Sequence, residues 1–213
     1  MRGSFITFEG CDGSGKSTQI LAIWRELQDS GVPVLLTREP GGTPFGEMVR
    51  RTLLDPAGPD RSILAELLLY AASRAELVRT VILPALRQGK VVLVERFTDS
   101  SLVYQGYAGG IPIPDIENIN RIATGDLEAD LTLVFDVNDP AVFRERLAPK
   151  DKDKIELRDD EYHAKVRQGY RDLAARYPSR IRLIDGTLPR DQVFQIILRE
   201  VRDILKQRGG EVL

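Results

Sequence analysis

The sequence predicts an α/β fold: a five-stranded parallel sheet flanked by helices on both faces, with a short lid segment. Short apolar runs alternate along the chain with stretches that carry apolar residues at helical spacing, as in right-handed strand–helix–strand units. A length of 213 residues and a hydrophobic content of 42% suit one such domain with a sizeable core. Because no repeat or long linker divides the sequence, we expect a single domain over residues 1–213.

Five short apolar runs are the predicted strands. The first is β-branched and aromatic, which is typical of a strand. The strands are expected at Phe5–Phe8, Val32–Thr37, Val91–Glu95, Leu131–Asp136 and Ile181–Ile184. Four of them end at or just before a polar residue, namely Glu9, Arg38, Glu95 and Asp136. Ligands of open parallel sheets bind beyond the carboxyl ends of the strands, so we expect these four side chains to converge around a binding site.

Helices are predicted between the strands. The first carries Ile20, Ile23, Trp24 and Leu27 on one face. The helices are expected at about residues 16–29, 44–54, 61–88, 115–124, 140–147, 158–176 and 190–207. Glycine and proline predict a loop over residues 106–114. The charged residues 148–157 are either a solvated loop or a mobile lid.

Composition excludes several classes of protein. A net charge of −2 gives no bulk electrostatic basis for nucleic-acid binding. The longest apolar runs, such as residues 63–72, are too short to span a bilayer, and no signal peptide is recognised at the N-terminus. A single cysteine forms no internal disulfide and indicates a reducing compartment. We therefore expect a cytoplasmic protein.

Gly10 to Ser17 match the phosphate-binding loop G-x-x-x-x-G-K-[ST] between the first strand and the first helix. Small residues let backbone N–H groups surround phosphate oxygens, and the helix adds the positive end of its dipole. Lys16 would reach the β and γ phosphates, and the Ser17 hydroxyl would hold Mg²⁺. The alternative is a glycine-rich turn without a ligand. The candidate ATP-binding residues are Gly10, Cys11, Asp12, Gly13, Ser14, Gly15, Lys16, Ser17 and Thr18.

The remaining residues favour a kinase over other nucleotide-binding proteins. The Asn-Lys-x-Asp guanine motif of GTPases and the Leu-Ser-Gly-Gly signature of transporter ATPases are missing from the sequence. Arginine instead stands at several predicted strand and helix ends, at Arg38, Arg50, Arg74 and Arg96. Arginine binds phosphate bidentately and disperses the charge of a transferring phosphoryl group, although a surface salt bridge is the alternative for each one alone. Several arginines at the ligand-binding edge of the predicted sheet indicate a protein that binds two phosphorylated molecules. The sequence therefore favours a nucleotide kinase.

Four motifs, in order along the chain, resemble those of bacterial thymidylate kinases. They are Phe8–Thr18, Thr37–Thr43, Tyr70–Arg74 and Glu95–Gly106. The resemblance spans essentially the whole chain and identifies the P-loop NTPase fold. It implies the reaction ATP + dTMP → ADP + dTDP with Mg²⁺, and a homodimer.

The resemblance also implies roles for single residues. Arg38, Arg50 and Arg96 match positions that hold the dTMP phosphate or the phosphoryl group in transfer. Asp12 matches a contact to the sugar hydroxyl or its waters, and Ser101 lies near base and sugar. Tyr70, where the family usually has Phe, matches the residue that stacks on thymine. Arg74 and Gln105 match the positions that hydrogen-bond the edge of the base. Glu95, where Asp is usual, would orient Arg96 or the water shell of Mg²⁺.

The last catalytic charge is expected in the lid. Family members with glycine at the position of Gly13 take this cation from the lid, which here offers Lys150, Lys152 and Lys154. Lys154 stands just before Ile-Glu, where arginine is usual, and is our first candidate, with Lys150 second.

Two other functions are compatible with part of the sequence, and two isolated residues, Cys11 and His163, are interpreted as having no chemical role. The loop and arginines would also serve a kinase of dUMP, dGMP or AMP, or a nucleotide-binding regulator without catalysis. Cys11 is interpreted as a small tolerated residue of the loop. His163 has no Cys or His partner at metal spacing, so we interpret it as a surface residue and expect no structural metal.

Overall fold

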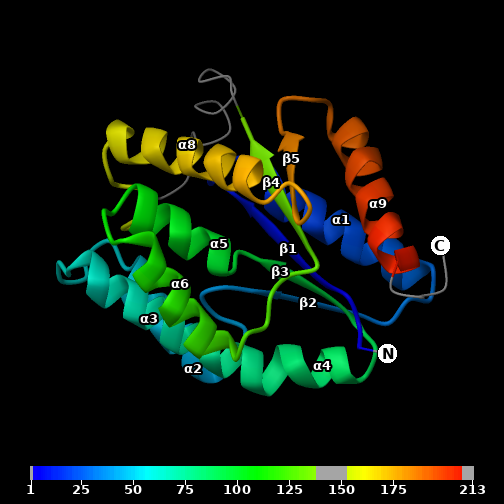
Figure 1. Ribbon diagram of the computed structural model, residues 1–213, viewed down its shortest axis with the longest axis horizontal. Helices are drawn as coiled ribbons and strands as arrows, with labels where there is room; N and C mark the ends of the chain where they lie inside the picture. The colour runs from blue at the N-terminus through cyan, green and yellow to red at the C-terminus, as the bar shows by residue number, and fades with distance from the viewer. Residues whose placement is uncertain (1, 138–152, 208–213) are drawn as a thin grey trace.

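The computed structural model describes residues 2–137 and 153–207 (Figure 1). Its centre is a five-stranded parallel sheet of order β2-β3-β1-β4-β5. The strands are β1 (Phe5–Gly10), β2 (Val34–Arg38), β3 (Val91–Glu95), β4 (Leu131–Asp136) and β5 (Ile181–Asp185). The fold class and the five predicted strands are confirmed. β2 begins two residues later than predicted because Pro33 has no N–H group, although its carbonyl still accepts from Val91 N at 2.9 Å.

Helices cover both faces of the sheet. α1 (Lys16–Asp29) and α9 (Arg190–Gln207) pack on one face, and α4 (Leu83–Arg87), α5 (Thr98–Ser101) and α8 (Asp160–Arg176) lie on the other (Figure 1). α2 (Pro44–Leu54), α3 (Ile63–Leu77) and α6 (Ile113–Thr124) pack together beyond this second layer. Two π-helical segments, η1 (Val78–Ile82) and η2 (Leu102–Tyr107), complete the described helices.

Two predicted segments differ from the structure, and one helical segment was not predicted. The helix expected over 61–88 is divided by η1, just before Pro84, which cannot donate to the preceding turn. The loop expected over 106–114 is shorter, because η2 runs to Tyr107 and α6 begins at Ile113. Residues 98–107 form a helical segment that was not predicted. The helix expected at 140–147 and residues 148–152 of the expected lid lie outside the described residues.

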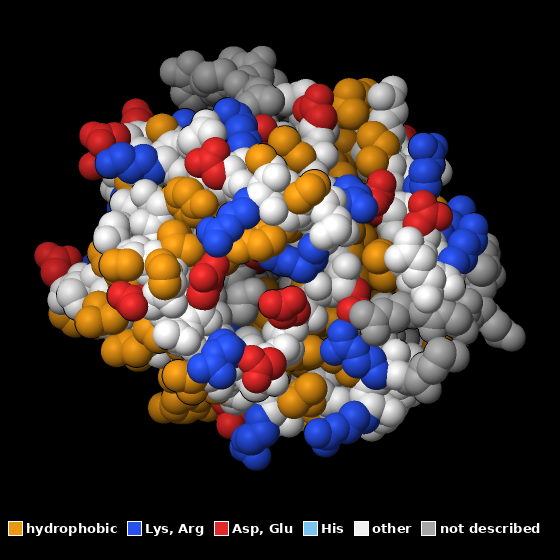
Figure 2. Space-filling model, viewed as in Figure 1, with side chains coloured by type: hydrophobic (Ala, Val, Ile, Leu, Met, Phe, Trp, Pro, Cys, Tyr) orange, Lys and Arg blue, Asp and Glu red, His pale blue; other side chains and the backbone are white. Residues whose placement is uncertain are grey.

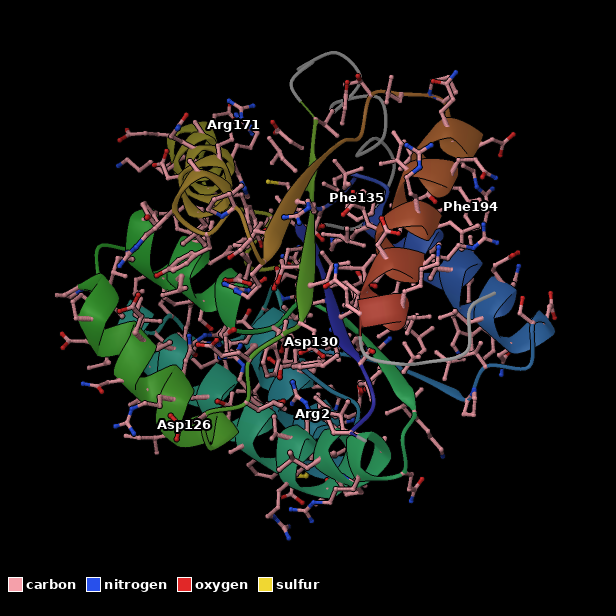
Figure 3. The ribbon with its side chains drawn as sticks, turned by 45° about the vertical axis from the view of Figure 1, so that its right-hand side comes forward. Arg2, Asp126, Asp130, Phe135, Arg171 and Phe194 are labelled. Atoms are coloured by element: carbon pink, nitrogen blue, oxygen red, sulfur yellow. The ribbon has the colours of Figure 1, made fainter. Side chains whose placement is uncertain are left out.

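The core lies on both faces of the sheet. On one face, apolar side chains of β1, β3 and β4 pack against α1 and α9, with Phe135 and Phe194 directed into this layer (Figure 3). On the other, the strands meet α8 and η2 in one cluster and η1 and α4 in another. At the amino ends of the strands, Arg2 donates to Asp130 at 2.8 Å (Figure 3). Along the described chain, none of the helices combines the length and apolar character that a membrane span requires.

The strand register brings the predicted polar residues to one edge. Arg38 of β2 lies beside Glu95 of β3, and Glu95 lies beside Phe8, which immediately precedes Glu9. Asp136, two strands away, binds Arg171 of α8 through both carboxylate oxygens. The four residues therefore lie at one edge of the sheet as expected: Arg38 and Glu95 line the cleft described below, Asp136 lines a small pocket with Cys11 and Ser14 of the loop, and Glu9 is buried.

Ile23 tests the packing of α1. Its side chain has no exposed surface. Replacing Ile23 with alanine should lower the free energy of unfolding by about 2–4 kcal/mol, from lost burial and the resulting cavity. Leu21, on the exposed side of the same helix, is the control, and Leu21→Ala should cost below about 1 kcal/mol. Urea unfolding of both variants measures the difference, and equal losses would contradict this packing.

Candidate active site

A cleft of about 320 Å³ opens at the carboxyl edge of the sheet. It is lined by the phosphate-binding loop, the ends of β2 and β3, and side chains of α2, α3, α5, η2 and the segment after residue 152. Ten of the predicted site residues line it, two of them from the loop itself. They are Asp12, Ser17, Arg38, Arg50, Tyr70, Arg74, Glu95, Arg96, Ser101 and Gln105. Figure 2 shows acidic and basic side chains interspersed over this view of the surface.

The loop takes the backbone shape that its glycines permit. Gly10, Gly13 and Gly15 have φ values of 131°, 77° and 94°, a region that favours glycine. A Cβ atom at Gly10 would lie 2.6 Å from the carbonyl oxygen of Phe135, so the loop could not pass β4 with a larger residue there. Gly15 caps α1, and Lys16, Ser17 and Thr18 form its first turn. The N-terminal N–H groups of α1 therefore face the loop, as anion binding requires.

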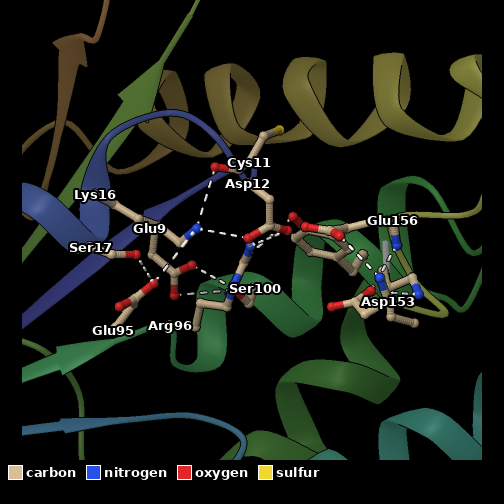
Figure 4. A network of polar contacts seen from close by, with 12 residues as sticks. Glu9, Cys11, Asp12, Lys16, Ser17, Glu95, Arg96, Ser100, Asp153 and Glu156 are labelled. Atoms are coloured by element: carbon tan, nitrogen blue, oxygen red, sulfur yellow. Dashed lines mark hydrogen bonds and ion pairs between the residues drawn. The ribbon is translucent and has the colours of Figure 1, made fainter. Parts of the chain in front are cut away.

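Lys16, Asp12 and Arg96 form one charged cluster. Asp12 Oδ1 accepts from Lys16 Nζ at 3.0 Å and from Arg96 at 2.9 Å, and Asp12 Oδ2 also accepts from Arg96 at 2.9 Å (Figure 4). Burial alone would raise the pKa of Asp12, but the two cations lower it well below its usual value. Lys16 is 3% exposed, and its ammonium group also donates to the carbonyl of Cys11 at 3.4 Å. A lysine and an arginine thus donate to the same carboxylate oxygen of Asp12.

Glu95 and Ser17 form a hydrogen-bonded pair close to Lys16. The Ser17 hydroxyl donates to Glu95 Oε1 at 2.7 Å, and Lys16 Nζ lies 3.7 Å from the same oxygen (Figure 4). A hydroxyl and a carboxylate oxygen are the hard ligands that Mg²⁺ prefers. The pair predicted from the sequence to hold the cation is therefore close together in the structure.

Arg96 has a strained backbone that a buried carboxylate supports. Its φ of 65° is left-handed, which is uncommon for a residue other than glycine. Glu9, fully buried at the end of β1, accepts from Phe97 N at 2.7 Å and from the backbone and side chain of Ser100. Tyr170 of α8 also donates to Glu9, at 2.9 Å. Burial, with Asp99 nearby, raises the pKa of Glu9. Glu9 was predicted only as a strand end, and sequence spacing gave no sign of this network.

The far end of the cleft holds a buried ion pair. Arg74 of α3, 1% exposed, donates from Nε to Glu39 Oε2 at 2.8 Å and from NH1 to Ser101 Oγ at 3.1 Å. Burial raises the pKa of Glu39 to about 7, although Arg74 opposes the shift. Glu39 Oε1 has no hydrogen-bond partner within the described part of the chain. Gln105, 2% exposed, also lines this end, and so does Tyr70.

Arg38 and Arg50 line the cleft near the ends of β2 and α2. Arg38 is half-exposed and lies 3.3 Å from Glu47. Arg50 donates to the carbonyl of Pro40 at 3.0 Å, and burial lowers its pKa, with the charge of Arg38 adding to the shift. Two guanidinium groups near each other in one cleft wall suit a phosphate that neutralises both.

The described end of the expected lid contacts the loop between α2 and α3. Lys154 Nζ donates to the carbonyl of Gly58 and lies 3.0 Å from Asp60. Asp153 and Ile155 line the cleft on either side, whereas Lys154 does not. Lys150 and Lys152 lie outside the described residues.

Cys11 and His163 have no sign of chemistry in the structure. Burial raises the pKa of the Cys11 thiol to about 11, so the thiol stays protonated. His163 packs edge to face on Tyr162 on the surface of α8. Among the described residues, no group of three or more His, Cys, Asp and Glu side chains could hold a metal ion.

The comparisons with known proteins agree with one another. The family model described as thymidylate kinase matches residues 8–197. The thymidylate kinase of Symbiobacterium thermophilum is 48% identical over 204 residues, covering 96% of this chain and 95% of its own length. That of Deinococcus radiodurans is 45% identical, covering 90% and 93%. Among solved structures, a thymidylate kinase from Ehrlichia chaffeensis matches with a TM-score of 0.77 and 34% identity, over 94% of this chain and 99% of that one.

Glu39 should make stability depend on pH. Its pKa is near 7 in the folded chain and near 4.5 when unfolded, so the folded state holds the proton more tightly. This stabilisation is complete below pH 4.5 and is lost as pH rises through 7. The free energy of unfolding, relative to a Glu39→Gln variant, should fall by about 2–3 kcal/mol over this range. Urea titrations at several pH values measure it. Glu161→Gln, a change at an exposed residue of α8, is the control and should keep the wild-type dependence on pH. If the wild type and Glu39→Gln depend on pH equally, the pKa assigned to Glu39 is wrong.

Proposed function

The chain belongs to the thymidylate kinase family and phosphorylates dTMP to dTDP with ATP, and we propose how its cleft divides that work. The observation that carries the proposal is the carboxylate of Asp12, which contacts both the loop lysine and Arg96. Lys16 belongs to the loop that binds the donor phosphates, and Arg96 lines the acceptor cleft. The two substrates therefore meet at Asp12.

On the donor side, residues 10–18 bind the phosphates of ATP. Backbone N–H groups of the loop and of the first turn of α1 surround the phosphate oxygens, and Lys16 leaves Asp12 to reach the β and γ groups. Asp12 then serves the acceptor, through the sugar hydroxyl or the waters bound to it. Its low pKa supports this role, because the carboxylate stays an acceptor throughout the working pH range.

Mg²⁺ fits the pair formed by Ser17 and Glu95. The hydroxyl and the carboxylate are 2.7 Å apart; Ser17 would bind the ion, Glu95 would act on it through water, and phosphate oxygens and water would be the remaining ligands. Bound there, the ion would neutralise charge that develops on the transferred phosphoryl group. Glu95, one methylene longer than the usual aspartate, reaches Ser17 directly in this chain.

On the acceptor side, the cleft has a phosphate end and a base end. Arg38, Arg50 and Arg96 bind the dTMP phosphate and align it with the γ-phosphoryl group. Tyr70 stacks on the thymine ring, while Arg74 and Gln105 bind its edge, with Ser101 between base and sugar. Positioning and charge stabilisation supply most of the catalysis of a phosphoryl transfer. The contacts that bind dTMP would therefore also lower the barrier of the reaction.

We further propose one kinase domain over residues 1–213, with a lid at about 148–157 that supplies a cation, and a cytoplasmic homodimer. For the dimer, Phe45 and Met48 of α2 and Leu64 and Leu68 of α3 are 46–57% exposed. Figure 2 shows hydrophobic side chains gathered at the lower left, where Figure 1 places these two helices. An apolar face of this kind suits burial against a second copy. The single cysteine suits a reducing compartment.

Arg96 and the choice of acceptor can be tested in one assay. ADP release is measured with dTMP, dUMP, dGMP and AMP as acceptors, and a strong preference for dTMP is expected. Arg96→Ala should lower kcat by about 10²–10³-fold, because the transferring charge loses a fixed donor. The control is Arg79→Ala, an exposed arginine of η1 outside the cleft, which should leave kcat unchanged. ATP binding without acceptor-dependent release would support a regulator instead, and equal release with every acceptor would contradict dTMP selection.

Lys154 is the first candidate for the lid cation. Lys154→Ala should lower kcat by about 10²-fold or more and leave the KM for dTMP nearly unchanged. Its contact with Asp60 offers a direct comparison, because Asp60→Ala removes the partner and keeps the lysine. If both variants lose activity equally, Lys154 acts by attaching this segment to the α2–α3 loop. A normal rate for Lys154→Ala would transfer the proposal to Lys150.

A further inference from the structure

We propose that Asn120 is a positioning residue for base selection, which holds Arg74 so that one N–H group remains for the base. Asn120 belongs to α6 and was not singled out from the sequence. It is 6% exposed, and it is absent from the residues that line the cleft. The proposal rests on the role proposed above for Arg74 at the edge of the base.

The argument begins with the donors of Arg74. A guanidinium group has five N–H groups in a fixed plane. The Nε group donates to Glu39 at 2.8 Å, and NH1 donates both to Ser101 at 3.1 Å and to Asn120 Oδ1 at 2.6 Å. NH2 donates to the carbonyl of Phe97 at 3.0 Å. Within the described residues, four of the five donors are used, and one N–H of NH2 is left.

The remaining donor has a chemical consequence. A guanidinium group has no acceptor, so this N–H can bind a carbonyl oxygen of a base but opposes an amino group at the same place. Thymine carries an oxygen at position 4, where cytosine carries an amino group. A site built to hydrogen-bond one group discriminates strongly against its replacement, because the buried donor is then left unpaired. Discrimination of this kind requires that Arg74 cannot turn to present a different set of atoms.

Asn120 restricts that turn. Its Oδ1 is the shortest contact of Arg74, and its Nδ2 donates to the carbonyl of Thr98 at 3.3 Å. The two contacts orient the amide, since reversing it would place an amino group against the arginine. Glu39, directly after β2, and Asn120 of α6 bind different nitrogens of Arg74, so together they fix the plane of the guanidinium.

Asn120 lies behind the cleft wall. It lines a second cavity of about 460 Å³, formed with Thr98, Asp99 and Thr124 and bounded by the end of α8. A substitution at Asn120 therefore changes no atom that lines the cleft, and of its hydrogen bonds to Arg74 and Thr98 the one to Arg74 reaches a residue of the cleft wall. This separates positioning from direct contact with substrate.

The experiment compares kcat and KM for dTMP and dCMP, and KM for ATP. Asn120→Ala and Asn120→Leu both remove the acceptor, and leucine keeps the volume. Both should raise the KM for dTMP about tenfold and lower the ratio of kcat/KM for dTMP over dCMP about tenfold, with the KM for ATP unchanged. Asn120→Asp keeps an acceptor toward Arg74 and should retain most of the discrimination. Asn118→Ala, an exposed asparagine of the same helix, is the matched control and should behave as wild type.

Three results would overturn the inference: unchanged discrimination in Asn120→Ala and Asn120→Leu, an equal loss in Asn120→Asp, or a parallel rise in the KM for ATP. The last two would mean that Asn120 only packs. Arg74→Ala, assayed alongside, keeps the inference distinct from the proposed function. If Arg74→Ala leaves the dTMP to dCMP ratio unchanged, the role proposed for Arg74 fails. If that ratio collapses in Arg74→Ala but not in the Asn120 variants, only the role of Asn120 fails.

Discussion

The buried carboxylate of Glu9 is the contact on which the geometry of the site depends. It lies near the end of the central strand and accepts hydrogen bonds from two segments distant in sequence: Phe97 and Ser100 at the start of α5, and Tyr170 of α8. A buried charge is tolerated only when hydrogen bonds satisfy it, and here four donors do so. These bonds fix the turn that follows Arg96, whose backbone is left-handed and whose guanidinium binds Asp12. The position of the acceptor arginine is thus set from inside the fold.

Charged side chains in this cleft are mostly held in place by other charges. Lys16 and Arg96 share Asp12, Arg74 is bound by Glu39, and Arg38 lies near Glu47. The buried pair of Arg74 and Glu39 costs desolvation, so its benefit is orientation more than stability. The raised pKa of Glu39 has the same cause, burial. On the acceptor side, arginines fixed in this way need not reorder at the moment of transfer, whereas Lys16 exchanges Asp12 for the donor phosphates.

The sequence predicted the sheet and the loop well because both depend on local signals. Apolar runs bounded by polar residues located the strands, and the glycine spacing located the loop. Residues 98–107 were missed as a helix because Ser100, Ser101 and Gly106 are poor helix formers, and burial of Leu102 and Val103 with the contacts to Glu9 stabilises the segment instead. The partners of Arg74 are 23 to 46 residues away in the chain. Helical and strand periodicity relates residues only a few positions apart, so only the folded structure identifies Glu39 and Asn120 as partners of Arg74.

The state of Cys11 has a practical consequence for work on this enzyme. It is the single cysteine of the chain, it is 7% exposed, and its thiol stays protonated at neutral pH. Thiol-directed reagents attack the thiolate, so the native chain is nearly inert to them. A cysteine introduced at an exposed position, such as Leu157, two residues after Ile155 of the cleft wall, would then be the one reactive thiol. The wild-type background thus accepts a single fluorescent or spin label near the cleft without first removing a residue of the phosphate-binding loop.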